Sequence, residues 1–337
     1  MNNGNMNSFF HLICIFIKVI NKNMISRRIL RAKVMQVLYA HLSSGKSFKE
    51  SEKELFFSIE KSYDLLFFII QLMIDLRDYA RERIDMAQQK NIPSYQDLNP
   101  NRSFVDNRVI TQIEQSRQFQ KYLSDKKLSW VNYPEMIKKL YGSLLEAEYY
   151  KRYVEIKNPD FNDDKKVIEK FLIKTLPDFE PFFQNLEEQS IFWNLEVDFV
   201  VSVLARAIKQ LEESEEVTGK IINDKVDEED ADFASKLFRK TVMHFDEYRG
   251  LIDEFTQNWD VDRIAFMDIL IMEMAINELI EFPSIPTKVT LNEYIDMAKA
   301  FSTNNSGQFV NGILDKIIFR LSDEKKIQKR GRGLINN

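Results

Sequence analysis

Apolar side chains recur every three or four residues along most of the chain, the spacing of one buried face of an α-helix. The first clear case begins after Ser26, a favourable N-cap, and ends at Ser43-Ser44-Gly45. Its predicted buried stripe consists of Leu30, Val34, Val37, Leu38 and His41. Along one flank of the same helix lie Arg28, Arg31, Met35 and Tyr39. The pattern predicts a helix with a core face beside a basic, partly aromatic flank.

The same periodicity predicts helices through the centre of the chain. One or two long helices are expected over 47–90, a polar helix over 110–126 and a further helix from Pro134. Two prolines and many polar residues make 91–108 a predicted loop. Only 9 Gly and 8 Pro occur in 337 residues, too few for the many tight turns of a sheet sandwich or barrel. The predicted fold class is all-α.

The C-terminal stretch predicts three more helices. A strongly apolar helix over 260–282 should be broken by Pro283–Pro286. Thr290 and Glu293 match the S/T-x-x-E capping box, which predicts the start of the next helix. In the last helix, Gly312 is unfavourable by about 1 kcal/mol relative to Ala. We expect it there because another backbone or a ligand approaches closely.

Part of the chain is repeated. Residues 164–212 align without gaps on 230–278 at an offset of 66, and the alignment places Trp193 on Trp259. Because tryptophan occurs only three times in the chain, this match is specific. It predicts two helix–helix–Trp–helix units, in each of which the tryptophan anchors the core. A stacking role for the tryptophans is the alternative.

Composition excludes several classes of protein. Gly is absent between Gly45 and Gly142, and again between Gly142 and Gly219, so neither G-x-G-x-x-G nor a phosphate-binding P-loop can be built there. The single Cys14 excludes an intrachain disulfide and a cysteine-rich metal site, and it fits a reducing, cytoplasmic compartment. No metal site and no cofactor are predicted, and the chain is not expected to be an enzyme.

Charge is unevenly distributed. The first 49 residues hold eight Lys and Arg and no acid, so with a net charge of −5 the other 288 residues carry −13. A localised basic segment on an acidic body favours a polyanion-binding site, and a solvated helix start is the alternative. The apolar run Phe9–Ile20 is too short to span a bilayer and lacks a signal-peptide pattern. We predict that 1–23 is a non-functional extension and that the functional protein begins near Met24.

Two ends of the sequence carry motifs of a known family. Near the C-terminus come Glu278-Leu279, Ser284-Ile285-Pro286, then Lys288 to Glu293 (K-V-x-[IL]-N-E), Ala298 to Ser302 (A-K-x-[FY]-S) and Phe309 to Asp315 (F-V-N-G-[IV]-L-D). Near the N-terminus, RRILRAKVMQVLYAHL ends in Gln36 to Tyr39 (Q-x-L-Y). In this order, these motifs resemble the transcription antitermination factor NusB. Asn305 and Gln308 depart from the acidic and basic residues common at those positions in the family.

The resemblance implies an all-α protein of NusB-like helical bundles that binds single-stranded boxA-like RNA, as in an rRNA leader. It also implies two protein partners, the ribosomal protein NusE and the RNA polymerase elongation complex, and no membrane. Cations on phosphates and aromatic rings under bases are the usual chemistry of single-stranded RNA binding. The candidate RNA-binding residues are Arg27, Arg28, Arg31, Lys33, Gln36, Tyr39, Phe309 and Asn311. Core packing is the alternative for both aromatic residues.

The resemblance also suggests a domain plan. After the extension 1–23, residues 24–45 are the Arg-rich first helix, and 46–227 are a helical expansion that includes the repeat unit 164–212. Residues 228–322 are the NusB-like C-terminal bundle, and 323–337 are a basic tail. A competing interpretation is a helical protein–protein adaptor that uses the expansion and does not bind RNA.

Overall fold

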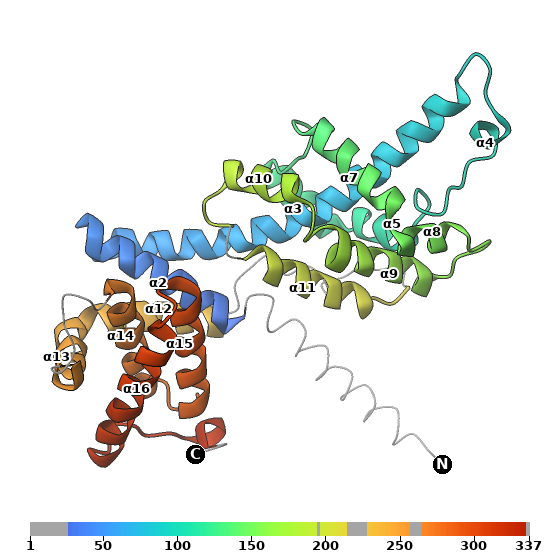
Figure 1. Cartoon of the computed structure of the whole chain (residues 1–337). Helices are drawn as coiled ribbons and strands as arrows, with labels where there is room; N and C mark the ends of the chain where they lie inside the picture. Colours follow the sequence, from blue (N-terminus) through green and yellow to red (C-terminus); the bar gives the residue numbers. More distant parts are fainter. Residues whose placement is uncertain (1–25, 194–195, 214–227, 257–264, 335–337) are drawn as a thin grey trace, which may run out of the picture. The chain divides into compact units, whose positions relative to one another are not determined.

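The computed structural model describes residues 26–193, 196–213, 228–256 and 265–334 (Figure 1). Over these residues the regular secondary structure is helical and contains no strand, which confirms the all-α fold class. None of the helices within the described ranges is long and apolar enough to cross a membrane.

The chain forms two compact units. Among the described residues, unit 1 comprises 60–193 and 196–213, and unit 2 comprises 26–59, 228–256 and 265–334. Helix α3 (Phe48–Gln88) is the single long helix of the range 47–90, and it passes from unit 2 into unit 1. The first turns of the predicted expansion therefore belong to unit 2.

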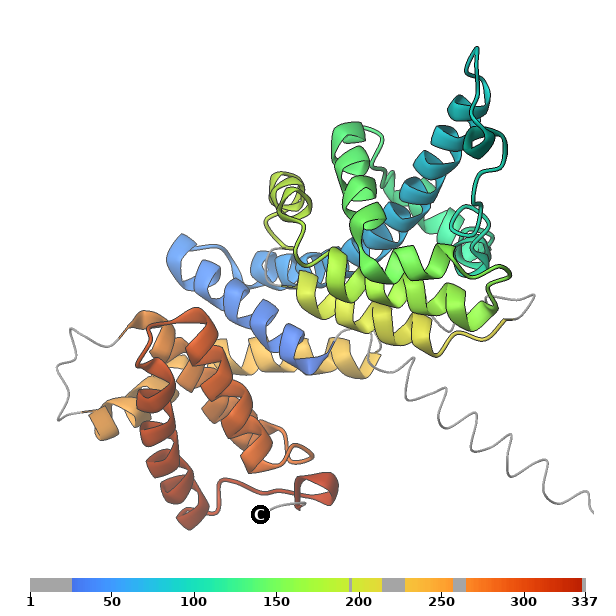
Figure 2. The same cartoon turned by 45° about the vertical axis from the view of Figure 1, so that its right-hand side comes forward.

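Unit 2 is built around one central helix. Its helices are α2 (Arg27–Ser44), residues 48–59 of α3, α12 (Glu228–Met243), α13 (Phe245–Thr256), α14 (Phe266–Glu281), α15 (Thr287–Phe301), α16 (Ser306–Asp323) and the short 3₁₀-helix η3 (Gly331–Leu334). Helix α14 contacts α2, α12, α13, α15 and α16, and every residue from 268 to 279 is buried. Helices α15 and α16, the orange-red and red helices of Figure 2, contact each other as well as α14. A helix that is apolar round most of its circumference is stable only when covered in this way.

Polar side chains of α14 face different neighbours. Asp268 accepts a hydrogen bond from Ser306 of α16 at 2.8 Å, and Glu273 accepts one from Arg249 of α13 at 2.8 Å. Asn277 donates to a backbone carbonyl of α12 at 2.9 Å. Since a buried polar group without a partner is costly, each contact favours one axial register of one neighbouring helix.

Unit 1 has an aromatic core around α3. Its other helices are α4 (Tyr95–Leu98), α5 (Arg108–Glu114), α6 (Arg117–Lys126), α7 (Pro134–Glu146), α8 (Glu148–Val154), α9 (Phe161–Lys170), the π-helical η1 (Phe171–Thr175), α10 (Glu180–Gln189) and α11 (Val197–Lys209). Residues 62–70 of α3 are all buried. The ring of Phe68 lies 3.8 Å from Trp130 and 5.6 Å from Trp193, measured between centroids.

The tryptophans of unit 1 are core anchors. Trp193 is buried, and its indole N–H donates to the carbonyl of Lys61 at 2.7 Å, as the prediction for this residue requires. Its repeat partner Trp259 lies outside the described residues. The two copies share one order of helices: α9 with η1, α10 and α11 in the first, α12, α13 and α14 in the second.

Local sequence signals locate several helix ends correctly. Helix α2 ends at Ser44, and Gly45 follows in the left-handed conformation (φ 66°). Pro134 occupies the first turn of α7. The polar stretch 110–126 is divided into α5 and α6 at Ser116, whose hydroxyl caps α6 by accepting from the Phe119 amide. The predicted loop 91–108 contains the short helix α4.

Two local predictions are wrong. Helix α15 starts at Thr287 after Pro286, so Thr290 lies inside the helix and is no N-cap. Its hydroxyl instead donates to Glu278 at 2.9 Å. A Cβ built on Gly312 would meet no described atom within 4 Å beyond its own helix backbone, so the predicted approach of another backbone does not occur there, and the approach of a ligand stays a prediction. The tight contact is at Gly307, where that Cβ would lie 2.6 Å from the side chain of Lys299.

Candidate nucleic-acid interface

Arg28 is the most exposed of the predicted phosphate-binding residues. It lies in the first turn of α2, and its side chain is 54% exposed. Its guanidinium donates to Asp296 at 2.5 Å and to Glu293 at 3.3 Å, both on α15. The cation is thus accessible to solvent but already paired with carboxylates.

Arg27 has a similar environment on the other side of α2. Its guanidinium donates to Glu229 of α12 at 2.6 Å and lies 3.7 Å from Asp230. It also lies 5.1 Å from the centre of the Phe233 ring, a cation–π distance. Four carboxylates therefore surround the two arginines, which the sequence pattern of an acid-free helix could not reveal.

Arg31 is placed in the core of unit 2. Its side chain is 4% exposed and forms two hydrogen bonds with Glu278, at 2.7 and 2.8 Å. The hydroxyls of Thr290 and Tyr294 donate to the same carboxylate at 2.9 and 3.1 Å. Burial by itself would lower the pKa of Arg31, but the hydrogen bonds and charge of Glu278 outweigh it and raise the pKa. Arg31 therefore fixes α2 on α14 and α15, and its guanidinium does not face solvent.

Lys33 and Gln36 are also less accessible than a binding flank requires. Lys33 is 1% exposed, and Gln36 is half-buried. The predicted basic flank of α2 is thus reduced, among its described members, to the exposed or half-exposed cations near the start of the helix, Arg27 and Arg28.

An exposed aromatic pair lies further along α2. Tyr39 is 45% exposed, and its ring lies edge-on to Phe266 of α14 at 5.7 Å between centroids. Phe266 is itself 40% exposed. The sequence does not single out Phe266, because it begins a helix that is apolar on every side. Together the two rings offer a surface on which an unpaired base could stack.

The predicted residues on α16 lie in its first two turns. Phe309 and Asn311 are half-buried, and Ser306 just before them is bonded to Asp268 of α14. This bond ties the start of α16 to the part of α14 that follows Phe266. The candidate interface therefore comprises a cationic end on α2 and an aromatic pair, with the start of α16 attached to the same stretch of α14.

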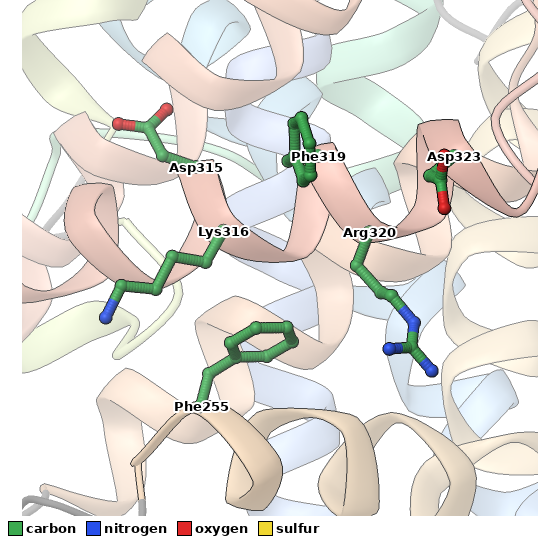
Figure 3. A pocket seen from close by; sticks show the side chains of 6 residues that line it. All are labelled: Phe255, Asp315, Lys316, Phe319, Arg320 and Asp323. Atoms are coloured by element: carbon green, nitrogen blue, oxygen red, sulfur yellow. The ribbon is translucent and has the colours of Figure 1, made fainter.

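A hollow in unit 2 lies between α13 and α16 (Figure 3). Its volume is about 540 Å³, and it is lined by Phe255, Asp315, Lys316, Phe319, Arg320 and Asp323. Phe319 is 79% exposed. Acidic and basic lining residues are equal in number, so the lining favours neither a polyanion nor a polycation. Within the described part of the chain, no group of three or more His, Cys, Asp or Glu could hold a metal ion.

Residues 197–319 match the family model of the NusB family. Three relatives, each a "Transcription antitermination protein NusB", support the match. The protein of Salinibacter ruber is 43% identical over 104 residues, which is 31% of this chain and 65% of that protein. Those of Chloroherpeton thalassium and Symbiobacterium thermophilum are 34% and 39% identical over 105 and 95 residues, covering 31% and 28% of this chain and 50% and 62% of theirs.

This part of the chain belongs to the NusB family. The chain spans between half and about two thirds of the length of these NusB relatives. The matched range begins with α11 and ends within α16, whereas α2 with its arginines lies outside it. The solved structure of T. maritima NusB is 23% identical and covers 51% of this chain and 98% of its own, with a TM-score of 0.29.

Proposed function

We propose that this protein is a transcription antitermination factor, not an enzyme, that binds single-stranded boxA-like RNA, as in an rRNA leader. The similarity of its NusB-family region to proteins of that name, at up to 43% identity, is the observation that supports this function. In the proposal it acts with the ribosomal protein NusE on the transcribing RNA polymerase. The acidic body of the chain would complement NusE, since ribosomal proteins are usually basic.

In this proposal RNA lies along α2. Arg27 and Arg28 contact phosphates, while Tyr39 and Phe266 stack on bases. From Arg28 to Tyr39 the helix rises by about 17 Å, enough for more than one nucleotide to contact the surface. Gln36, Phe309 and Asn311 supply further contacts, and Arg31 and Lys33 support the helix from within.

Binding of a labelled boxA-like single-stranded RNA, measured by fluorescence anisotropy over a range of salt, tests the proposal. Tyr39→Ala should weaken binding by about 1–3 kcal/mol without changing the salt slope, because stacking involves no counterion. Tyr95→Ala is the matched control, since Tyr95 is an exposed tyrosine of unit 1. Equal affinity of the Tyr39 and Tyr95 variants would contradict the stacking surface.

The cationic end predicts a different signature. Arg28→Ala should weaken binding to all sequences alike and reduce the salt slope by at most about 0.7, the value for one phosphate on a single strand. Arg320→Ala, at an exposed arginine paired with Glu324 on α16, is its control. Unchanged affinity of the folded Arg28 variant at every salt concentration would remove this end of α2 from the interface.

One observation favours the adaptor function as an alternative. The tip of unit 1 exposes Met86, Ile92, Tyr95 and Leu98, although Ser94 and Asp97 form a capping box that orders it. Large exposed apolar side chains of this kind are typical of protein contacts. A wild-type protein that binds NusE but no single-stranded RNA would favour the adaptor over the RNA-binding function.

A further inference from the structure

We propose that Glu293 and Asp296, with Glu229 and Asp230 opposite, act as intramolecular competitors of RNA and set the affinity of the cationic end of α2. This inference rests on the proposed RNA-binding function. In the free protein these carboxylates occupy the guanidinium groups that a phosphate would use. An incoming polyanion must replace them.

The formal charge of this end supports competition. Arg27 and Arg28 contribute +2, and the four carboxylates within 3.7 Å of them contribute −4. Arg31 also lies 3.5 Å from Glu293, but its buried pair with Glu278 is neutral as a whole and leaves this balance unchanged. Although α2 has no acid in its first turn, folding brings acids from two other helices to it. The two arginines and these four carboxylates therefore have a combined charge of −2 until the carboxylates are displaced.

Exposure makes the displacement feasible. The side chains of Arg28 and Asp296 are 54% and 50% exposed, so their ion pair is screened by water. Exposed pairs of this kind are weak, in contrast to the buried pair of Arg31 and Glu278. A phosphate, which accepts bidentate hydrogen bonds from arginine, can replace a carboxylate at Arg28 without opening the core.

Competition also changes the expected response to salt. When a phosphate displaces Asp296, the freed carboxylate beside RNA takes up a cation, which offsets part of the counterion release. The wild-type salt slope should therefore be shallower than the number of phosphate contacts implies. Removing the carboxylate charges should make it steeper.

The decisive variant is Glu293→Gln/Asp296→Asn, which keeps the shape and one acceptor oxygen of each side chain but removes both charges. The matched control is Asp323→Asn/Glu324→Gln, which changes the net charge of unit 2 equally at two exposed acids of α16 and the residue after it. With boxA-like RNA at low salt, we expect the first variant to bind about 3- to 10-fold more tightly than the control. Its salt slope should be steeper by about 0.7.

A double-mutant cycle assigns the gain to Arg28. Asp296 also pairs with Lys299 at 3.4 Å, so part of any gain could come from that lysine. If Arg28 is responsible, Arg28→Ala should remove most of the gain in the Glu293→Gln/Asp296→Asn background. Thermal unfolding of every variant checks that the proteins remain folded.

The outcomes separate the two proposals. RNA binding by the wild type with equal affinities for the variant and its control would overturn the competition but leave the proposed function intact. Absence of RNA binding by the wild type and the variant alike would overturn both. A gain that persists in the Arg28→Ala background would overturn the assignment to Arg28.

Discussion

Helices α11 and α14 occupy equivalent places in the two copies of the repeat, yet only α14 is buried on all sides. Its polar core residues Asp268, Glu273, Asn277 and Glu278 align, at the offset of 66, with Ser202, Ala207, Leu211 and Glu212. Ser202 and Glu212 are exposed, and Leu211 is buried. Helix α11, which lies at the surface of unit 1, thus lacks the buried polar contacts that α14 makes at the centre of unit 2.

The difference shows that the two units specify the packing of their cores in different ways. In unit 2, neighbours approach α14 from every side, and polar contacts distinguish one register from the next. In unit 1 the central element is α3, where the rings of Phe67, Phe68, Trp130 and Trp193 pack instead. Large aromatic side chains specify packing by shape, whereas buried polar pairs do so by the cost of breaking them.

Glu278→Ala should have the largest effect on stability. It leaves Arg31 buried without its carboxylate, which should lower the free energy of unfolding by about 4–5 kcal/mol. Urea unfolding followed by circular dichroism measures the loss, and hydrogen exchange should locate it in α2. Glu212→Ala, at the aligned exposed residue, is the control and should change stability by less than about 0.5 kcal/mol. Similar losses of stability in both variants would contradict the claim that only α14 depends on buried polar contacts.

Trp193→Ala tests the aromatic core of unit 1. Removal of a buried tryptophan should lower the free energy of unfolding by about 3–4 kcal/mol, through lost apolar burial and a cavity. RNA affinity of the remaining folded protein should not change. Ile191→Ala, two residues away at a highly exposed side chain, provides the baseline in the same denaturation experiment. A stable Trp193 variant with weakened RNA binding would instead make this tryptophan a binding residue.

Glu273 predicts a pH dependence that α11 cannot have, because its aligned residue is Ala207. Burial raises the pKa of Glu273 from 4.5 to about 7, although Arg249 opposes the shift. Between these values the folded protein retains a proton that the unfolded chain releases. Protonated Glu273 therefore contributes to the free energy of unfolding below pH 4.5. This contribution is lost as the pH rises to about 7, a change of about 3 kcal/mol. The difference between wild type and Glu273→Gln, measured by denaturation at several pH values, should follow this curve; a flat difference would refute it.

Exchange of one aligned pair gives the smallest effects. Asp268→Ser removes the acceptor of the Ser306 hydroxyl and should destabilise unit 2 by about 1–2 kcal/mol. The reverse change Ser202→Asp adds a carboxylate on the exposed side of α11 and should alter stability by less than about 0.5 kcal/mol. Thermal unfolding of the two variants side by side compares them. A larger loss of stability from Ser202→Asp than from Asp268→Ser would mean that the side chain at this position matters as much for the packing of α11 as for that of α14.

The sequence predicts those features of the molecule that depend on neighbouring residues. Gly45 ends α2 and Pro134 starts α7 because both residues act on their own backbone conformation. Thr290 matches a local capping motif, but a partner on α14 outcompetes the cap, so the motif predicts the wrong role.

The candidate site shows the same limit. The sequence motifs predict a site on α2 and α16, and Tyr39 is exposed, as a residue that stacks on a base must be. Arg31, in contrast, has the sequence pattern of an exposed cation and is buried on a carboxylate 247 residues away. Phe266 has the pattern of a core residue and is partly exposed. In both cases the outcome depends on which helices pack together, and periodicity along one helix does not contain that information.

The separation of Arg31 from Glu278 also bears on how the protein is made. The apolar face of α2 is covered by helices that are made about 180 or more residues later, since unit 1 is inserted between them. At about 5–20 residues per second, translation of the 247 intervening residues takes roughly 12–50 s. During that time unit 1 can fold while Leu30, Val34 and Leu38 have no core to enter. A nascent chain of this protein should therefore depend on chaperones at its first helix until synthesis passes α14.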